Sequence, residues 1–151
     1  MNLVIGCDSL LMAQAVGVRA QVIVGESPTS HELGLDGKDL ISQHAILYDG
    51  MQVVGAARLI LSDGYAELSR VVVVKEYCGK QLSSILVESL IKYARKQKVT
   101  VLTAYADSHL TMYYQTIGFE FIQQVREGVE GARHSIEMRM NLHNERLDQP
   151  A

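Results

Sequence analysis

Short apolar runs and alternating apolar and polar positions fill most of the chain, and turn residues separate them. The stretch "MNLVIG" at residues 1–6 predicts a first strand, and Asp8 or Ser9 can cap a helix with an apolar face over residues 10–16. The polar stretch from Gly25 to Gln43 contains glycines and a proline. It predicts a long loop or a short broken helix, and loops of that length are often functional.

Two Asp-Gly pairs indicate hairpins in the next part of the chain. Asp49-Gly50 and Asp63-Gly64 each separate two apolar runs, and Asp-Gly suits the positive φ of tight turns. The pattern therefore predicts three successive antiparallel strands, at about 44–48, 51–61 and 65–74.

A strongly amphipathic helix follows Gly79. One face carries, at helical spacing, Leu82, Ile85, Leu86, Ser89, Leu90 and Tyr93. Its last turns and the residue just beyond are basic, which suits a helix C-terminus: Lys92, Arg95, Lys96 and Lys98.

The C-terminal part reads as strand, short helix, strand, strand. "VTVLTAYA" at 99–106 predicts a strand, and Asp107 or Ser108 starts a short helix that runs through Ile117 and ends at Gly118. "FEFIQQV" is a further strand, and "SIEMRMN" at 135–141 alternates as a half-buried strand. This order predicts an α/β or α+β sheet domain over residues 1–142 with helices packed on it, followed by a polar tail at 143–151.

Composition narrows the class of protein. With 151 residues and 48% apolar residues, the chain can bury one core. A net charge of −3 argues against general nucleic-acid binding, and no apolar run is long enough to span a membrane. Cys7 and Cys78 have no disulfide or zinc spacing, and the histidines have no metal-site spacing. We therefore expect a cytoplasmic protein with no metal, no nucleic-acid partner and no membrane partner.

The junction of the valine run with the amphipathic helix is a candidate anion site. A helix N-terminus carries unpaired N–H groups and a partial positive charge. Gly79 can supply a tight turn, Lys80 adds charge, and the small Ser83 and Ser84 let a ligand approach the backbone. From spacing alone, a plain structural turn remains the alternative.

Two motifs together resemble the GNAT superfamily of N-acetyltransferases. "VVV" at 71–73 followed by "CGKQLS" at 78–83 aligns with its acyl-CoA motif, and "YYQTIGF" at 113–119 with its later F/Y-Y-x-x-x-G-F. "VRAQVIVGE", "HELGLDGKD" and "GARHSIEM" extend the likeness to the ElaA/YjcF-like branch, over roughly residues 15–140. The resemblance implies a GNAT fold with a mixed, mostly antiparallel sheet of six or seven strands and helices on both faces.

The resemblance also implies acetyl-CoA as cosubstrate. Its pantetheine would pair with the strand ending at Val73, where the sheet splays from the strand near 99–105, and its pyrophosphate would sit on the amides of residues 79–84. The implied cofactor-binding residues are Val71, Val72, Val73, Cys78, Gly79, Lys80, Gln81, Leu82, Ser83, Ser84 and Asp107. Asp107 stands where many relatives carry an asparagine that contacts CoA, and a helix N-cap is its alternative role.

Two residues depart from the family pattern. Cys78 replaces an arginine or glutamine, and Gln81 replaces the middle glycine. We expect weakened rather than abolished CoA binding, because the backbone donors remain.

The implied reaction is direct attack of a primary amine on the thioester in a ternary complex. Tyr114 matches the tyrosine placed to protonate the CoA sulfur, with core packing as the alternative. Glu67 is the preferred candidate for the catalytic base, with His134 or water as the alternatives. Strand alternation should put Glu67 on one face with Val71 and Val73.

Five charged residues cluster around the predicted long loop: Arg19, Glu26, Glu32, Asp36 and Asp39. The acidic ones can attract a cationic small-molecule or peptide amine, with a plain solvated loop as the alternative. Related folds often form homodimers. The alternative functions are a non-catalytic acyl-CoA binder and an interaction module without ligand.

Overall fold

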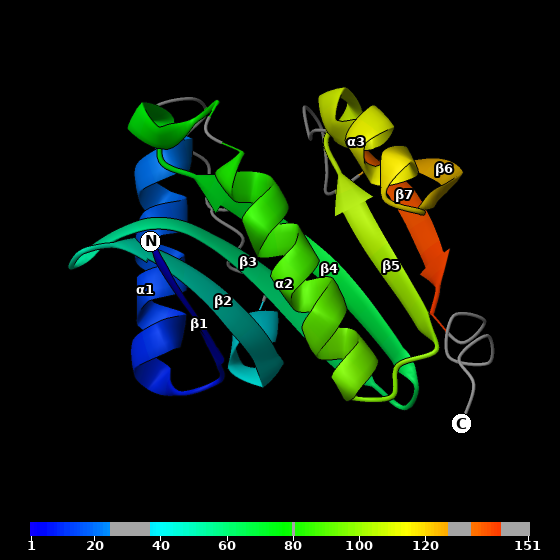
Figure 1. The fold of residues 1–151 in the computed structure, drawn as a ribbon, viewed down its shortest axis with the longest axis horizontal. Helices are drawn as coiled ribbons and strands as arrows, with labels where there is room; N and C mark the ends of the chain where they lie inside the picture. The colour runs from blue at the N-terminus through cyan, green and yellow to red at the C-terminus, as the bar shows by residue number, and fades with distance from the viewer. Residues whose placement is uncertain (25–36, 80, 127–133, 143–151) are drawn as a thin grey trace. The chain divides into compact units, whose positions relative to one another are not determined.

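The protein forms one seven-stranded, mostly antiparallel sheet with helices packed on it. The computed structural model describes residues 1–24, 37–79, 81–126 and 134–142. The strand order is β1-β2-β3-β4-β5-β7-β6. Strands β4 and β5 run parallel, whereas the pairs β1–β2, β2–β3, β5–β7 and β6–β7 are antiparallel. This confirms the fold class predicted from the sequence (Figure 1).

The elements follow the predicted order closely. The strands are β1 (Asn2–Gly6), β2 (Ser42–Asp49), β3 (Gln52–Ser62), β4 (Tyr65–Val73), β5 (Val101–Ala106), β6 (Glu120–Arg126) and β7 (His134–Asn141). The α-helices are α1 (Ser9–Val24), α2 (Leu82–Lys96) and α3 (Thr111–Thr116). Three short 3-10 helices are η1 (Lys38–Ile41), η2 (Lys75–Tyr77) and η3 (Ser108–Leu110). The sequence predicted none of the three as such, although η1 falls in the stretch predicted as a loop or broken helix.

The chain divides into two compact units that each contain segments distant in sequence. The first unit comprises Met1–Ile60 and Arg70–Lys92, and the second comprises Leu61–Ser69 and Tyr93–Ala151. The single domain over 1–142 stays a prediction, and its tail at 143–151 lies outside the described residues.

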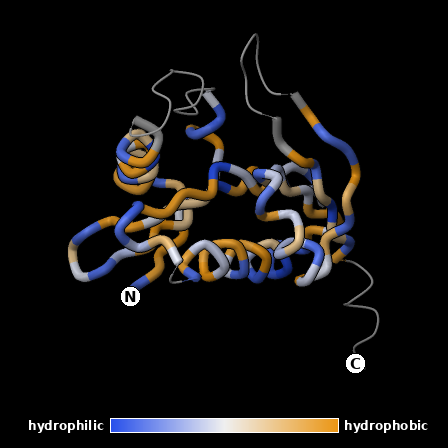
Figure 2. The backbone as a smooth tube through the Cα atoms, turned by 90° about the horizontal axis from the view of Figure 1, so that it is seen from above, coloured by the Kyte–Doolittle hydropathy of each residue, from blue (hydrophilic) through white to orange (hydrophobic). Residues whose placement is uncertain are grey.

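In the first unit, helices cover both faces of β2 and β3. Leu11, Ala15 and Val18 of α1 pack against Ile46 and Ala56. Gly55, next to Ala56, faces the other way, and a Cβ there would lie 3.0 Å from Cδ1 of Leu86 in α2. Successive strand residues point to opposite faces, so α1 and α2 lie on opposite sides of the strands (Figure 2).

The helix start at Asp8 and both hairpin turns are confirmed. The Leu11 amide donates to Oδ1 of Asp8 at 2.9 Å, as a capping side chain does. Gly50 and Gly64 have φ values of 62° and 81°. These features were predictable because each depends on a few neighbouring residues.

The predicted buried face of α2 is wrong at one position. Ile85 is 44% exposed. The buried stripe of α2 instead comprises Leu82, Leu86, Val87, Leu90, Ile91 and Ala94. These positions also follow the i, i+3, i+4 spacing, but the stripe is rotated from the predicted face toward Val87 and Ile91, so Ile85 falls outside it.

In the second unit, β4 through Ser69 pairs with β5, and β5 and β6 flank β7. Tyr65–Leu68 of β4 runs parallel to Val101–Ala104 of β5. The backbone N–H of Phe119 donates to the carbonyl oxygen of Tyr114 at 2.9 Å and closes α3. Gly118 has a φ of 116°, and a Cβ there would lie 3.3 Å from Cε of Met140, so this turn requires glycine.

Candidate functional site

The turn between β4 and α2 is the first part of the candidate site. Val71, Val72 and Val73 form the end of β4 and are half-buried. Val74 is buried and its amide donates to the carbonyl oxygen of Val54 on β3 at 2.9 Å. The chain then passes through η2 and reaches α2 within a few residues, so the helix N-terminus lies directly beyond the strand end.

Two residues of this turn have left-handed backbone conformations. Gly79 has a φ of 86° and Gln81 a φ of 61°, and Lys80 between them lies outside the described residues. A side chain in this conformation costs roughly 1–2 kcal/mol. Position 81, where the family pattern has glycine, therefore has a backbone that favours glycine, and Gln81 occupies it with strain.

Such a turn before a helix is suited to bind an anion. The first amides of α2 have no acceptor within the helix, and the dipole of the helix favours negative charge there. Leu82 is buried, so only its backbone is available to a ligand. The Ser84 hydroxyl donates to the carbonyl oxygen of Gln81 at 2.7 Å, which orients this side chain back toward the turn.

Cys78 precedes Gly79 and is exposed. Its Sγ lies 3.7 Å from the carbonyl oxygens of both Val73 and Val74, so the thiol is directed toward the end of β4. It supplies no positive charge where the family pattern has a basic or amide side chain.

A pocket of about 330 Å³ adjoins this turn within the first unit. Its walls combine the last part of α1, the end of β4 and η2. They are formed by Gln21, Val22, Val73, Val74, Lys75, Glu76 and Cys78. Two residues implied as cofactor-binding, Val73 and Cys78, thus line a cavity, and Glu76 adds a carboxylate to it.

The strand that leads to this turn is irregular at Arg70. Arg70 has a φ of 55°, which interrupts the regular alternation of side chains in β4. The register with β5 ends at Leu68, just before this point. The predicted common strand face of Glu67, Val71 and Val73 therefore loses the support of regular alternation across Arg70, and it stays a prediction.

The candidate catalytic residues lie in the second unit. Glu67 is half-buried on β4, opposite Thr103 of β5. Tyr114 is 1% exposed and packs edge-on against Tyr113 and Phe119, with ring centroids 5.6 Å and 5.2 Å apart. Burial, and then the charges of Tyr113 and Asp107, raise the pKa of Tyr114 well above its usual value, so its phenol stays protonated at neutral pH.

Asp107 and His134 have no confirmed role. Asp107 precedes η3 and its side chain makes no capping hydrogen bond there, so the helix-cap alternative is not supported. His134 begins β7, opposite Arg126 of β6. The assignment of all these site residues stays a prediction.

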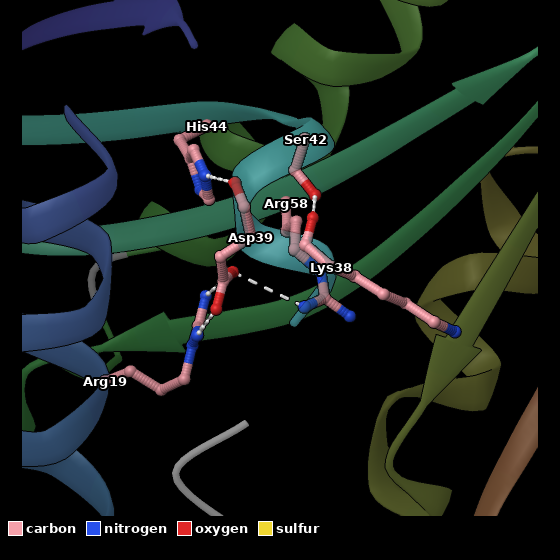
Figure 3. Close-up of polar contacts among 6 residues, drawn as sticks. All are labelled: Arg19, Lys38, Asp39, Ser42, His44 and Arg58. Carbon is pink, nitrogen blue, oxygen red and sulfur yellow. Dashed lines mark hydrogen bonds and ion pairs between the residues drawn. The ribbon is translucent and has the colours of Figure 1, made fainter. Parts of the chain in front are cut away.

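Asp39 was predicted to be one of the acidic residues that attract an amine, but its carboxylate is buried and paired with arginines. Asp39 is 8% exposed and accepts hydrogen bonds from Arg19 at 3.1 and 3.3 Å and from Arg58 at 3.4 Å (Figure 3). Its carboxylate is thus paired with two buried guanidinium groups and does not face solvent. Glu26, Glu32 and Asp36 lie outside the described residues.

Arg58 was not expected at this cluster, because it lies within the apolar run of β3; it is 1% exposed. His44 is fully buried, and its Nε2 lies 2.9 Å from the carbonyl oxygen of Asp39, so it is a structural part of this cluster. The cluster therefore joins α1, η1, β2 and β3 (Figure 3).

The described part of the chain contains neither a candidate membrane-spanning helix nor a candidate metal site. No helix in that part of the chain is long and apolar enough to cross a membrane. Over the same residues, no group of histidine, cysteine and carboxylate side chains is arranged to hold a metal ion.

Known proteins resemble this chain in both sequence and fold. A family model described as an acetyltransferase (GNAT) domain matches residues 21–142. An uncharacterized N-acetyltransferase, YjcF of Bacillus subtilis, is 27% identical over 82% of this chain and 89% of its own length.

Two solved structures also match. An acyl-CoA N-acyltransferase from Pseudomonas aeruginosa is 25% identical, with a TM-score of 0.76 over 93% of this chain and 99% of that one. Escherichia coli ElaA is 21% identical, with a TM-score of 0.78 over 93% of this chain and all of that one. The chain therefore belongs to the GNAT family of acetyltransferases, and it is similar to YjcF in sequence and to ElaA in fold.

Proposed function

We propose that the protein transfers an acetyl group from acetyl-CoA to a primary amine by direct attack in a ternary complex. The observation that carries this proposal is the left-handed turn at Gly79 and Gln81 immediately before α2. It leaves the first amides of the helix directed at a ligand, as a pyrophosphate requires. The end of β4 at Val71–Val73 would offer its backbone to the pantetheine arm.

The chemistry needs one proton donor and one proton acceptor. The amine nitrogen attacks the thioester carbon, the C–S bond breaks, the departing thiolate takes a proton and the ammonium loses one. Tyr114 would supply the proton to the sulfur, since its phenol stays protonated at neutral pH. Glu67, His134 or a water molecule would accept the proton of the amine.

The acceptor is proposed to be a small-molecule or peptide amine. The carboxylate of Asp39 is already paired with Arg19 and Arg58. Among the described residues, the carboxylate of Glu76, which lines the pocket at the end of β4, is therefore a better candidate to attract a cationic amine. A cytoplasmic location and a homodimer fit this proposal. The name of YjcF specifies an N-acetyltransferase and no acceptor, so experiment must identify the acceptor amine.

A non-catalytic acyl-CoA binder is the second candidate, favoured by Cys78 and the strained Gln81. Incubation with acetyl-CoA and a panel of primary amines separates the two functions. The panel should contain polyamines, amino acids, a peptide with a free N-terminus and a lysine peptide with a blocked N-terminus. We expect release of free CoA thiol with at least one amine, whereas saturable acetyl-CoA binding without turnover on any amine would favour the binder.

Restoring the family's basic residue should strengthen cosubstrate binding. We expect Cys78→Arg to bind acetyl-CoA about tenfold more tightly, because one hydrogen bond to a charged group contributes about 1.5–3 kcal/mol and tenfold in affinity equals about 1.4 kcal/mol. The low end applies because position 78 is exposed. Isothermal titration calorimetry measures the change.

Cys7→Arg is the matched control, since Cys7 is also an exposed cysteine in the first unit. It adds the same charge away from the turn and should leave affinity unchanged. Equal gains in both variants would attribute the effect to net charge, and no gain at Cys78 would argue against a pyrophosphate at this turn.

A further inference from the structure

Tyr77 connects the turn of the candidate site to a distant hairpin. Tyr77 is the last residue of η2 and immediately precedes Cys78 and Gly79. Its hydroxyl donates to Oδ2 of Asp49 at 2.6 Å. Asp49 is the last residue of β2, at the turn into β3, and both residues belong to the first unit.

The ring of Tyr77 is fixed independently of its hydroxyl. It packs against the core cluster that α1 forms with the sheet, which contains Leu11, Ala15, Val18, Ile46, Ala56 and Val74. The Tyr77 amide also donates to the carbonyl oxygen of Val74 at 2.8 Å, and the Cys78 amide to that of Lys75 at 3.1 Å. Tyr77 is therefore held at its backbone, its ring and its hydroxyl.

The residues that follow have a backbone that needs such support. Gly79 and Gln81 are both left-handed, and Gln81 carries a side chain that disfavours this conformation. Strained conformations persist when the surrounding structure holds them in place. The hydrogen bond between the side chains of Tyr77 and Asp49 connects the described part of this turn to the end of β2.

We propose that the hydrogen bond from Tyr77 to Asp49 positions Cys78, Gly79 and the start of α2 for binding the pyrophosphate of acetyl-CoA. This inference rests on the proposed function and assigns Tyr77 and Asp49 as positioning residues. Neither touches the reacting atoms. The bond sets where the turn lies relative to the end of β4, and thereby how well its amides meet the phosphate oxygens.

The test compares variants that remove this bond. Tyr77→Phe keeps the ring in its core contact and removes the donor, and Asp49→Ala removes the acceptor. We expect each to raise the Kd and KM for acetyl-CoA about three- to tenfold, with kcat at saturating acetyl-CoA unchanged. The double variant should be no worse than either single variant, because both changes remove the same interaction. Asp49→Asn keeps an acceptor oxygen and should restore binding to near the wild-type value.

Tyr65→Phe is the matched control, since Tyr65 is 61% exposed at the start of β4. It should bind acetyl-CoA as the wild type does. Wild-type affinity in Tyr77→Phe, or losses that add in the double variant, would overturn the inference. So would a fall in kcat with KM unchanged.

Amide hydrogen exchange of the segment 75–86 separates this inference from the proposed function. We expect faster exchange of this segment in Tyr77→Phe and Asp49→Ala, with unchanged exchange in β2 and β3, whether or not a ligand is present. If the wild type fails to bind acetyl-CoA, the proposed function fails, and the binding part of the inference fails with it. Unchanged exchange of the segment in the variants would overturn the positioning role even where the wild type binds acetyl-CoA.

Discussion

Replacing Asp39 by alanine is expected to lower the free energy of unfolding by about 3–5 kcal/mol, because it leaves two buried guanidinium groups without their shared carboxylate. Arg19 and Arg58 are each 1% exposed and both contact Asp39. Urea unfolding followed by circular dichroism measures the loss. Few single substitutions have an effect of this size.

Two further variants test the cause of this loss. Glu120→Ala removes an exposed carboxylate from β6 and should change stability by less than about 0.5 kcal/mol. Asp39→Asn keeps the shape of the side chain and removes its charge. Its loss in free energy of unfolding should therefore lie between those of Asp39→Ala and Glu120→Ala. Equal stability of Asp39→Ala and Glu120→Ala would show that the buried ion pairs do not hold the fold.

The same cluster predicts how stability depends on pH. Burial alone would raise the pKa of Asp39, but the hydrogen bond and charge of Arg19, with those of Arg58, outweigh it and hold the pKa below its usual value. A carboxyl with a lower pKa in the folded state stabilises the fold above its unfolded pKa of about 4, and this contribution is lost as pH falls through the folded pKa. Wild-type stability should therefore fall more steeply below about pH 4 than that of Asp39→Ala.

Replacing Tyr114 by phenylalanine is expected to lower kcat by about 10²-fold or more, the range of a lost general acid. The Kd for acetyl-CoA should change little, since only the hydroxyl is removed. Steady-state kinetics on the acceptor found in the amine panel, with calorimetry for binding, separates the two quantities. The ring contact with Phe119 is retained in the variant, so the fold should persist.

Tyr113→Phe provides the matched control, because Tyr113 is the neighbouring tyrosine on α3 and its ring contacts that of Tyr114. Its kcat should stay near the wild-type value. Because the pKa of Tyr114 is raised by burial, its ionisation should cause no fall in the wild-type rate up to about pH 10. A kcat of Tyr114→Phe equal to that of the wild type would mean that Tyr114 is a core residue only.

Features fixed by neighbouring residues could be predicted from the sequence. The cap at Asp8 and the turns at Gly50 and Gly64 depend on side-chain and backbone chemistry within a few positions. The order of strands and helices followed from hydrophobic periodicity and from the family resemblance. Both signals are local or motif-based, so a single sequence carries them.

Features that depend on distant residues could not be predicted. Asp39 was expected to face an amine, but its partners lie 20 and 19 residues away, and Arg58 is hidden in an apolar strand. Glu137 alternates as an exposed residue would, yet it is 9% exposed and accepts hydrogen bonds from Gln123 and Arg139. The left-handed backbone at Arg70 has no local signal either, because arginine carries no preference for that conformation.

The most direct test of the central claim is a calorimetric titration of the purified protein with acetyl-CoA, with 3′-dephospho-CoA as a comparison for the part of affinity that depends on the 3′-phosphate. The account predicts saturable acetyl-CoA binding with a micromolar or lower Kd, because the amides at the start of α2 and the left-handed turn at Gly79 and Gln81 hold the pyrophosphate. No binding even at millimolar acetyl-CoA would contradict it. The turn between β4 and α2 would then be a structural connection that Cys78 and Gln81 have closed to the cosubstrate.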